Sequence, residues 1–165
     1  MRSVYVTGKR GEVHDQHSIF FFTGDNLSDK VVNTWYTFHL VPKKRPVVNP
    51  PKARFERINA PTKNGYLDFS EDLDGLHYNN RTGSWEFIVL HEFHPKKTWY
   101  QIYYKIQKKF NGKIFNVCLS DDPAFYYTGR IFVNEWKSCE HWSTITLDYD
   151  LYPFKVRFDR ITDTY

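Results

Sequence analysis

Apolar and polar residues alternate in short runs along most of this chain. In the run Ser143–Tyr149, apolar residues at positions 145, 147 and 149 alternate with polar ones. A period of two places these two sets on opposite faces of a strand, one buried and one polar. Similar short runs lie between turn signals, which predicts a sandwich or barrel. The predicted strands are Ser18–Phe22, Thr34–Val41, Ala53–Ile58, Ser84–Leu90, Lys113–Leu119, Phe125–Trp136, Trp142–Asp148 and Lys155–Phe158.

The spacing of apolar residues changes to that of a helix over about residues 95–110. Pro95 suits the first helical turn, and Lys108 and Lys109 suit the last. Asn111-Gly112 supplies a left-handed stop before the next strand. We therefore predict a mainly β (α+β) fold, an antiparallel β-sandwich with one packed helix. The helix would pack through its apolar residues Trp99, Ile102, Tyr103, Ile106 and Phe110.

Two connecting segments have compositions typical of irregular structure. Val41–Pro51 holds four of the eight prolines. Because proline fixes φ and donates no hydrogen bond, this segment is expected to be a rigid packed strap rather than a continuous strand. Ile58–Asp68 has Asn64-Gly65 at its centre, which predicts a hairpin. Asp121-Asp122-Pro123 predicts a turn between two strands.

The composition favours a β-rich protein with contact surfaces. The 165 residues include 14 Phe, 12 Tyr and 5 Trp, and aromatic residues favour strands and are enriched at interfaces. This length fits a single domain over residues 1–165. The net charge of +4 is spread along the chain. The longest basic run, Lys43-Lys44-Arg45, lies between two prolines and predicts a solvated turn, so we assign no nucleic-acid binding to it.

Cysteine usage and hydropathy bear on where the chain is made. Cys118 lies in an apolar stretch and Cys139 in a polar turn, and two cysteines without a secretion signal are more often thiols than a disulfide. Met1–Lys9 lacks the apolar core of a signal peptide, and no window approaches the roughly 20 apolar residues of a membrane span. We therefore expect synthesis in a reducing cytoplasm and no membrane insertion.

No motif supports an enzyme, a metal site or a cofactor. The pairs His91/His94 and His14/His17 lack zinc-finger and helical i, i+4 spacing, so we interpret His94 as a helix-entry residue and the second pair as a solvated loop. The adjacent carboxylates at 121 and 122 are better explained by a turn than by acid–base catalysis. The aromatic run Phe125-Tyr126-Tyr127 beside Arg130 could stack on a sugar or base, but core plus subunit interface is the favoured interpretation.

Several segments together resemble one family, the distal tail proteins of long-tailed phages, in order and spacing over most of residues 33–155. The family is identified from short stretches rather than from a catalytic signature. These stretches are Asn33-Thr-Trp, His39-Leu-Val-Pro, Arg45-Pro-Val-Val-Asn-Pro-Pro51, Asn80-Arg-Thr-Gly-Ser-Trp-Glu-Phe-Ile-Val89, Asn111-Gly-Lys113, Asp121-Asp-Pro123, Tyr126-Tyr-Thr-Gly-Arg130, Val133-Asn-Glu-Trp-Lys-Ser138 and Trp142-Ser-Thr-Ile-Thr-Leu-Asp-Tyr-Asp150.

The resemblance implies a structural virion protein without enzymatic activity. Members have a tail-tube-type fold and assemble into a hexameric ring in the virion tail, made in the host bacterial cytoplasm. Such a ring joins the tail tube protein to the tail tip hub or tail-associated protein, contacts the tape measure protein, and lets phage DNA pass through its lumen without specific binding. Two alternatives stay open: another tail tube or baseplate ring subunit of a phage or contractile injection machine, and a monomeric carbohydrate-binding β-sandwich.

Subunits of a closed ring contact head to tail, so each needs two different complementary surfaces. The strap Val41–Pro51 and the hairpin Ile58–Asp68 are the candidate contact segments. Many family members continue into a second, carbohydrate-binding sandwich, which is not expected in a sequence that ends at Tyr165, and residues 1–32 fit the family pattern loosely and receive no role. The residues expected at assembly contacts are Arg45, Pro46, Asn49, Pro50, Asn64, Gly65, Arg81 and Trp136.

Overall fold

A computed structural model describes residues 17–24, 31–59, 61–62, 64–71, 75–139 and 142–158. The strands are β1 (Ile19–Phe22), β2 (Val32–Asn33), β3 (Leu40–Pro42), β4 (Arg57–Asn59), β5 (Tyr66–Asp68), β6 (Arg81–Leu90), β7 (Lys113–Leu119), β8 (Phe125–Ser138), β9 (Trp142–Leu151) and β10 (Val156–Arg157). The helices are α1 (Thr34–Phe38), the 3-10 helix η2 (His91–Phe93) and α2 (Trp99–Phe110).

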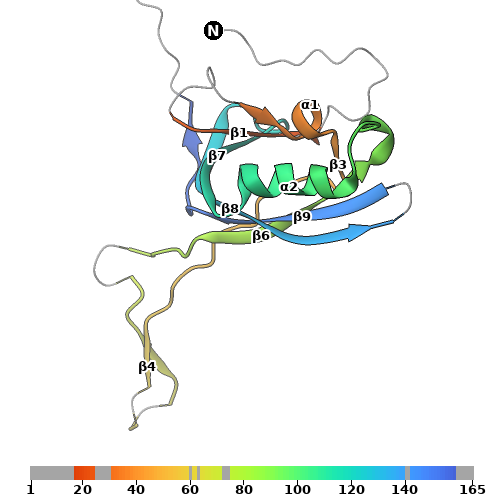
Figure 1. Cartoon of the computed structure of the whole chain (residues 1–165). Helices are drawn as coiled ribbons and strands as arrows, with labels where there is room; N and C mark the ends of the chain where they lie inside the picture. The colour runs from red at the N-terminus through yellow and green to blue at the C-terminus, as the bar shows by residue number, and fades with distance from the viewer. Residues whose placement is uncertain are drawn as a thin grey trace, which may run out of the picture.

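One antiparallel sheet forms the body of the molecule, with the strand order β2-β1-β7-β8-β9-β6-β3 and with β10 paired to β8. The sheet curls, because β2 and β3 stand at opposite ends of this order and only the short helix α1 separates them in sequence. Figure 1 shows β1 above α2, and β6, β8 and β9 below it. The mainly β fold with one packed helix is therefore confirmed, and hydrogen bonding runs continuously from one layer to the other.

Aromatic side chains fill the space between the layers. The ring of Phe21 in β1 lies 6.2 Å from that of Trp85 in β6 and 4.8 Å from that of Phe110 in α2, measured between centroids. Ile19 and Phe21 are fully buried, so part of segment 1–32, which received no role from the sequence, belongs to the core. Residues 1–16 and 25–30 lie outside the described residues.

The helix α2 matches its predicted C-terminus but begins later than predicted. Gly112 adopts a φ of 74° directly before β7, as the left-handed stop requires. At the other end, Thr98 is the N-cap and forms a capping box with Gln101. Pro95 therefore lies before the helix and not in its first turn, because the capping box satisfies the first free N–H groups three residues further on.

The predicted strand Thr34–Val41 is wrong over most of its length. The Asn33 side chain accepts hydrogen bonds from the N–H groups of Trp35 and Tyr36, at 2.8 and 3.0 Å, and starts α1. His39 ends this helix in a left-handed conformation with a φ of 51°. Side-chain capping by Asn33 thus overrides the strand preference of an aromatic run, and only β3 at its end is a strand.

Candidate assembly surface

The strap Val41–Pro51 leaves the sheet at the end of β3, and its residue Val48 packs against the hydrophobic core. The indole N–H of Trp85 donates a hydrogen bond to the carbonyl oxygen of Val47, at 2.9 Å. The N–H of Asn49 donates to the hydroxyl oxygen of Tyr149, at 3.0 Å. These bonds join the backbone of the strap to side chains of β6 and β9, so the packed strap predicted from the prolines is confirmed.

Gly83 in β6 makes this arrangement possible. It is the cross-strand partner of Tyr149, and a Cβ atom at Gly83 would lie only 2.6 Å from the Tyr149 ring and 2.6 Å from Nδ2 of Asn49. The ring of Tyr149 instead stacks on Trp85, with centroids 4.3 Å apart, and burial raises the pKa of its hydroxyl. The glycine of the Asn80–Val89 motif therefore serves close packing.

Arg81 ties the strap to the chain that follows β9. Its Nε donates to the carbonyl oxygen of Pro153 at 2.6 Å, and its Nη1 donates to that of Asn49 at 3.0 Å. The guanidinium also lies 5.3 Å from the ring centroid of Tyr127. Arg81 and Asn49, both expected at assembly contacts, thus hold together three segments of the same chain.

Arg45 pairs with the turn between β7 and β8. Its Nε lies 2.8 Å from Oδ2 of Asp121, and Nδ1 of His17 lies 3.2 Å from Oδ1 of the same carboxylate. Burial raises the pKa of Asp121, but hydrogen bonds from Arg45 and His17 outweigh this effect and leave the pKa below its ordinary value. Of the two prolines expected at contacts, Pro46 is buried and Pro50 is exposed.

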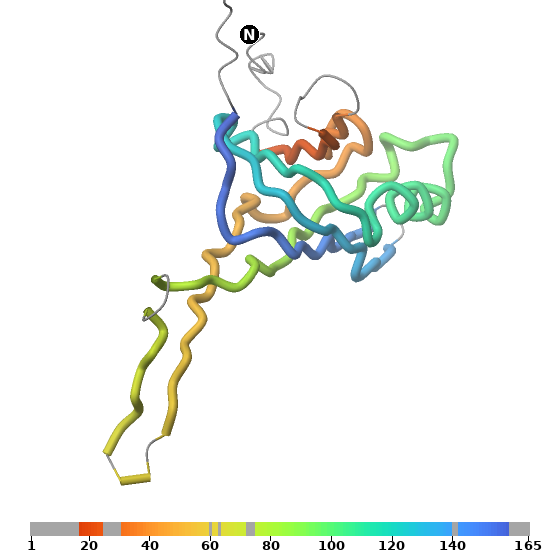
Figure 2. Tube along the Cα trace, turned by 90° about the vertical axis from the view of Figure 1, so that its left-hand side faces the viewer, coloured from red at the N-terminus to blue at the C-terminus, as the bar shows by residue number. Residues whose placement is uncertain are grey.

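The described residues between positions 52 and 80 form an arm that projects from the body (Figures 1 and 2). Its outer part is the predicted hairpin, in which β4 pairs with β5. Its inner part is held by a bridge between Ala53 and Tyr78. The predicted strand Ala53–Ile58 is therefore a regular strand only from Arg57 onward. Nearer the body, the two segments of the arm pair at an isolated β-bridge.

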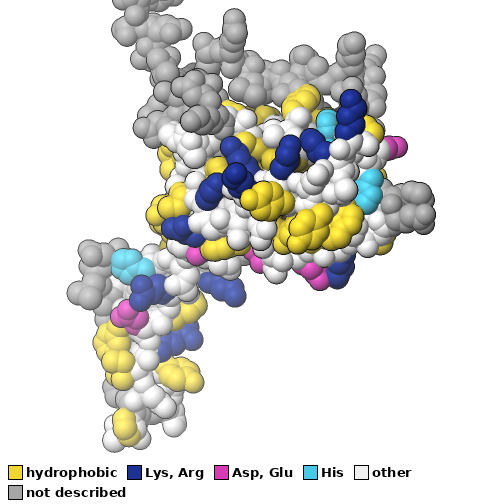
Figure 3. All heavy atoms as spheres, viewed as in Figure 1, with side chains coloured by type: hydrophobic (Ala, Val, Ile, Leu, Met, Phe, Trp, Pro, Cys, Tyr) yellow, Lys and Arg dark blue, Asp and Glu magenta, His cyan; other side chains and the backbone are white. Residues whose placement is uncertain are grey.

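The arm exposes apolar side chains on both faces, because it is a single two-stranded layer. Ile58 and Leu67 stand opposite each other, with 59% and 39% of their surface exposed. Phe55, Tyr66 and Phe69 are exposed as well, and Figure 3 shows hydrophobic side chains along the arm. None of the described arm residues belongs to the hydrophobic core cluster.

The tip and the root of the arm differ in character. At the tip, Asn64 and Gly65 are exposed, and Gly65 has a positive φ of 92°, a conformation that glycine adopts without steric cost. At the root is an open polar groove of about 600 Å³. Oδ1 of Asp150 in this groove is buried and has no hydrogen-bond partner among the described residues. The groove is lined by Lys52, Arg54, Tyr78, Asn79, Asn80, Thr82 and Asp150.

Trp136, the last of the expected contact residues, lies away from the arm. Its ring stacks on Trp99 with centroids 5.9 Å apart and lies 4.9 Å from the ring of Tyr103. The indole is half-buried against α2. The structure thus brings Asn49 and Arg81 together where the strap meets β6, and it places Trp136 in β8 against α2.

Two histidines outside the arm that were weighed as metal ligands form structural hydrogen bonds instead. Nε2 of His91 lies 2.8 Å from the Ser143 hydroxyl, and Nε2 of His94 lies 3.1 Å from the Phe38 carbonyl oxygen. No group of three metal-ligating side chains occurs among the described residues, and His14 lies outside them.

Burial raises the pKa of the Cys118 thiol to about 12. No described helix is long and apolar enough to cross a membrane.

Comparison with known proteins identifies a similar fold. No protein-family model and no curated protein matches the chain. A solved structure does: the Dit protein (gp 19.1) of SPP1, a paradigm of the hub adsorption apparatus in phages that infect Gram-positive bacteria. It is 14% identical, with a TM-score of 0.55, and the match covers 86% of this chain and 52% of that chain. The chain thus spans about half the length of this structure, and the match confirms the fold that the sequence resemblance implied.

Proposed function

We propose that this protein is a structural, non-enzymatic component of a phage tail, a distal tail protein that assembles into a ring. The ring would have six copies, stand at the distal end of the virion tail and join the tail tube to the tip hub. Its partners would be other copies of the chain, the tube protein, the hub or tail-associated protein and the tape measure protein. Phage DNA would pass through its lumen without specific binding.

The projecting arm is the observation that carries this proposal. An isolated two-stranded hairpin is marginally stable in water, and this one exposes Phe55, Ile58, Tyr66, Leu67 and Phe69. Each phenylalanine, isoleucine or leucine among them contributes about 1.5–3 kcal/mol when it is fully buried. The fold likeness to a phage tail protein supports the same conclusion. An arm of this composition is stabilised by packing on another protein surface.

Ring assembly gives the arm a partner. In a head-to-tail ring, the arm of one subunit packs on a different surface of the next, so that each chain supplies both halves of the contact. The exposed Asn64 and Gly65 at the tip would reach the neighbour. Arg81 and Asn49 would act within the subunit by fixing the direction in which the arm leaves the body, because Arg81 binds the strap at the Asn49 carbonyl oxygen and the Asn49 side chain binds β6 at the Thr82 carbonyl oxygen.

The test compares two isoleucines of nearly equal exposure. Ile58 on the arm is 59% exposed and Ile114 on β7 is 52% exposed. We expect the wild-type protein to form rings with a central hole in negative-stain images and to show the mass of a hexamer by light scattering after size exclusion. Ile58→Ser should shift the mass toward the monomer, because burial of this side chain at each interface is lost, and Ile114→Ser should not.

The negative-stain images also distinguish a distal ring from the alternative functions. Tubes of stacked rings would favour a tail tube subunit over a distal ring. A folded monomer that stays monomeric at high concentration, and in the presence of tube and hub proteins, would contradict ring assembly. In that case a glycan array would test the carbohydrate-binding alternative, with the polar groove at the arm root as the site to mutate.

A further inference from the structure

One face of α2 carries a concentration of positive charge. Residues 93–120 contain no aspartate or glutamate. The apolar side of the helix, formed by Ile102, Ile106 and Phe110, is buried. The opposite side and flank of the helix, with Lys97 before it and Lys113 after it at the start of β7, form what we name the basic helix face. The basic helix face consists of Lys97, Tyr100, Tyr104, Lys105, Lys108, Lys109 and Lys113.

The charge on this face is not neutralised within the described part of the chain. The ion pairs between described residues use cations at positions 17, 43, 45, 57, 137 and 155, all outside α2. Lys97 instead lies beside another cation, and the positive charge of Lys105 lowers its pKa. In Figure 3 basic side chains gather beside exposed hydrophobic ones on the side of the body where Figure 1 shows α2, and acidic side chains lie toward the margin of this view.

Helix stability explains only part of this charge. Lys113 donates to the carbonyl oxygen of Lys108 at 2.6 Å, which satisfies a free carbonyl at the C-terminal end and suits the helix dipole. Lys97 precedes the N-terminus of α2, where the dipole disfavours a cation. The pair Lys97 and Lys105 therefore works against local stability, and an anionic partner would relieve it.

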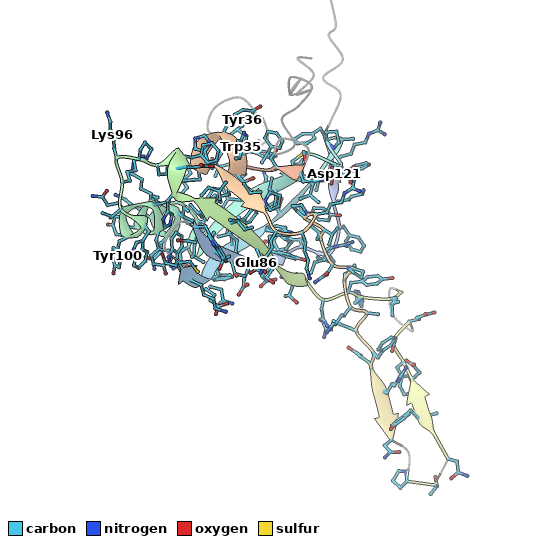
Figure 4. All side chains as sticks on the ribbon, turned by 90° about the vertical axis from the view of Figure 1, so that its right-hand side faces the viewer. Trp35, Tyr36, Glu86, Lys96, Tyr100 and Asp121 are labelled. Atoms are coloured by element: carbon cyan, nitrogen blue, oxygen red, sulfur yellow. The ribbon has the colours of Figure 1, made fainter. Side chains whose placement is uncertain are left out.

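Two tyrosines stand among these lysines. Tyr100 is 64% exposed and Tyr104 is 58% exposed, and Figure 4 shows Tyr100 at the outer surface of the helix end. Their spacing of four residues places them in one row that continues to Lys108. Exposed aromatic rings interleaved with lysines combine the two contacts that single-stranded nucleic acids use, stacking of bases and neutralisation of phosphates.

We propose that the basic helix face binds single-stranded nucleic acid without sequence preference. The lysines contact phosphates, and Tyr100 and Tyr104 stack on bases. An acidic protein surface would satisfy the lysines alone, so the two tyrosines favour nucleic acid. This activity uses no residue of the arm and is independent of ring formation.

The experiment measures fluorescence anisotropy of a labelled mixed-sequence DNA strand of about 20 nucleotides over a range of salt concentrations. Each lysine–phosphate contact contributes about 0.7 to the slope of log K against log salt. The triple variant Lys105→Gln, Lys108→Gln, Lys109→Gln should therefore lower the magnitude of the slope by about 2. The matched control Lys44→Gln, Lys137→Gln, Arg157→Gln removes the same charge elsewhere and should leave the slope unchanged.

A second variant tests stacking. Tyr100→Ala, Tyr104→Ala should weaken binding by at least about fivefold at constant salt, and its circular dichroism and light-scattering mass should equal those of the wild type. Absence of binding at low salt, or equal losses in the two charge variants, would overturn the proposal. So would full competition by poly-glutamate together with unchanged binding by the tyrosine variant, since that result indicates an acidic protein partner. Light scattering reports ring formation separately.

Discussion

The hydroxyl of Tyr149 reaches across Gly83 to accept a hydrogen bond from the N–H of Asn49, at 3.0 Å. The glycine lets the ring lie flat against the strand, where it stacks on Trp85. The Tyr149 ring of β9 therefore contacts the backbone of the strap at the place where Gly83 leaves β6 without a side chain. This contact fixes the direction in which the chain leaves the body toward the arm.

Substitution Gly83→Ala should destabilise the protein by about 2–3 kcal/mol. The new methyl group displaces the Tyr149 ring, so the hydrogen bond to Asn49 and part of the stacking on Trp85 are lost. Chemical denaturation measures the free energy of unfolding. Ser84→Ala, at the exposed neighbouring position of β6, should change it by less than about 0.5 kcal/mol. Equal effects of the two substitutions would contradict this steric role of Gly83.

The pair Arg45 and Asp121 should contribute stability that depends on pH. The folded pKa of Asp121 lies below its ordinary value, so its stabilisation is present above an unfolded pKa of about 3.9 and is lost as the pH falls through the folded value. Asp121→Asn removes this contribution. We expect the difference in melting temperature between wild type and Asp121→Asn to be largest near neutral pH and to shrink below about pH 4. A difference that is constant with pH would contradict the pairing.

The two cysteines should differ in reactivity. Cys118 is buried and its thiol pKa is about 12, whereas Cys139 is exposed. Because the thiolate is the reactive form, Ellman's reagent at pH 8 should modify one thiol per chain quickly and the second only after unfolding. Cys139→Ser should abolish the fast phase, and Cys118→Ala should leave it intact. Two fast thiols in the native protein would show that β7 is open to solvent.

The start of α2 can be tested at its cap. Thr98→Ala removes the acceptor for the Gln101 N–H and should lower the free energy of unfolding by about 1 kcal/mol. Pro95→Ala should have little effect, because this residue lies before the helix. Urea unfolding of both variants measures the difference. A larger loss for Pro95→Ala would place the helix start where the sequence alone predicted it.

Local pattern was sufficient for elements whose residues alternate with a clear period. The predicted strand Lys113–Leu119 is identical to β7, and the stop at Gly112 was predicted from the Asn-Gly pair. The local pattern failed to predict α1, where aromatic residues favour a strand but the Asn33 side chain caps a helix. A cap outweighs propensity in so short a segment because it satisfies two of the N–H groups that would otherwise remain free.

The sequence by itself determined the strand-rich class, the single long helix and the prolines that make the strap extended, since these depend on neighbours within a few residues. Only the tertiary structure decided that the strap packs beneath Tyr149, 100 residues away from Asn49. It also decided that both faces of the arm are exposed, while one face of the similarly alternating strand β6 is buried at Trp85, Phe87 and Val89. Alternation shows which side chains share a face. Whether that face is buried depends on a second layer, which the curl of the sheet supplies to the body and leaves absent from the arm.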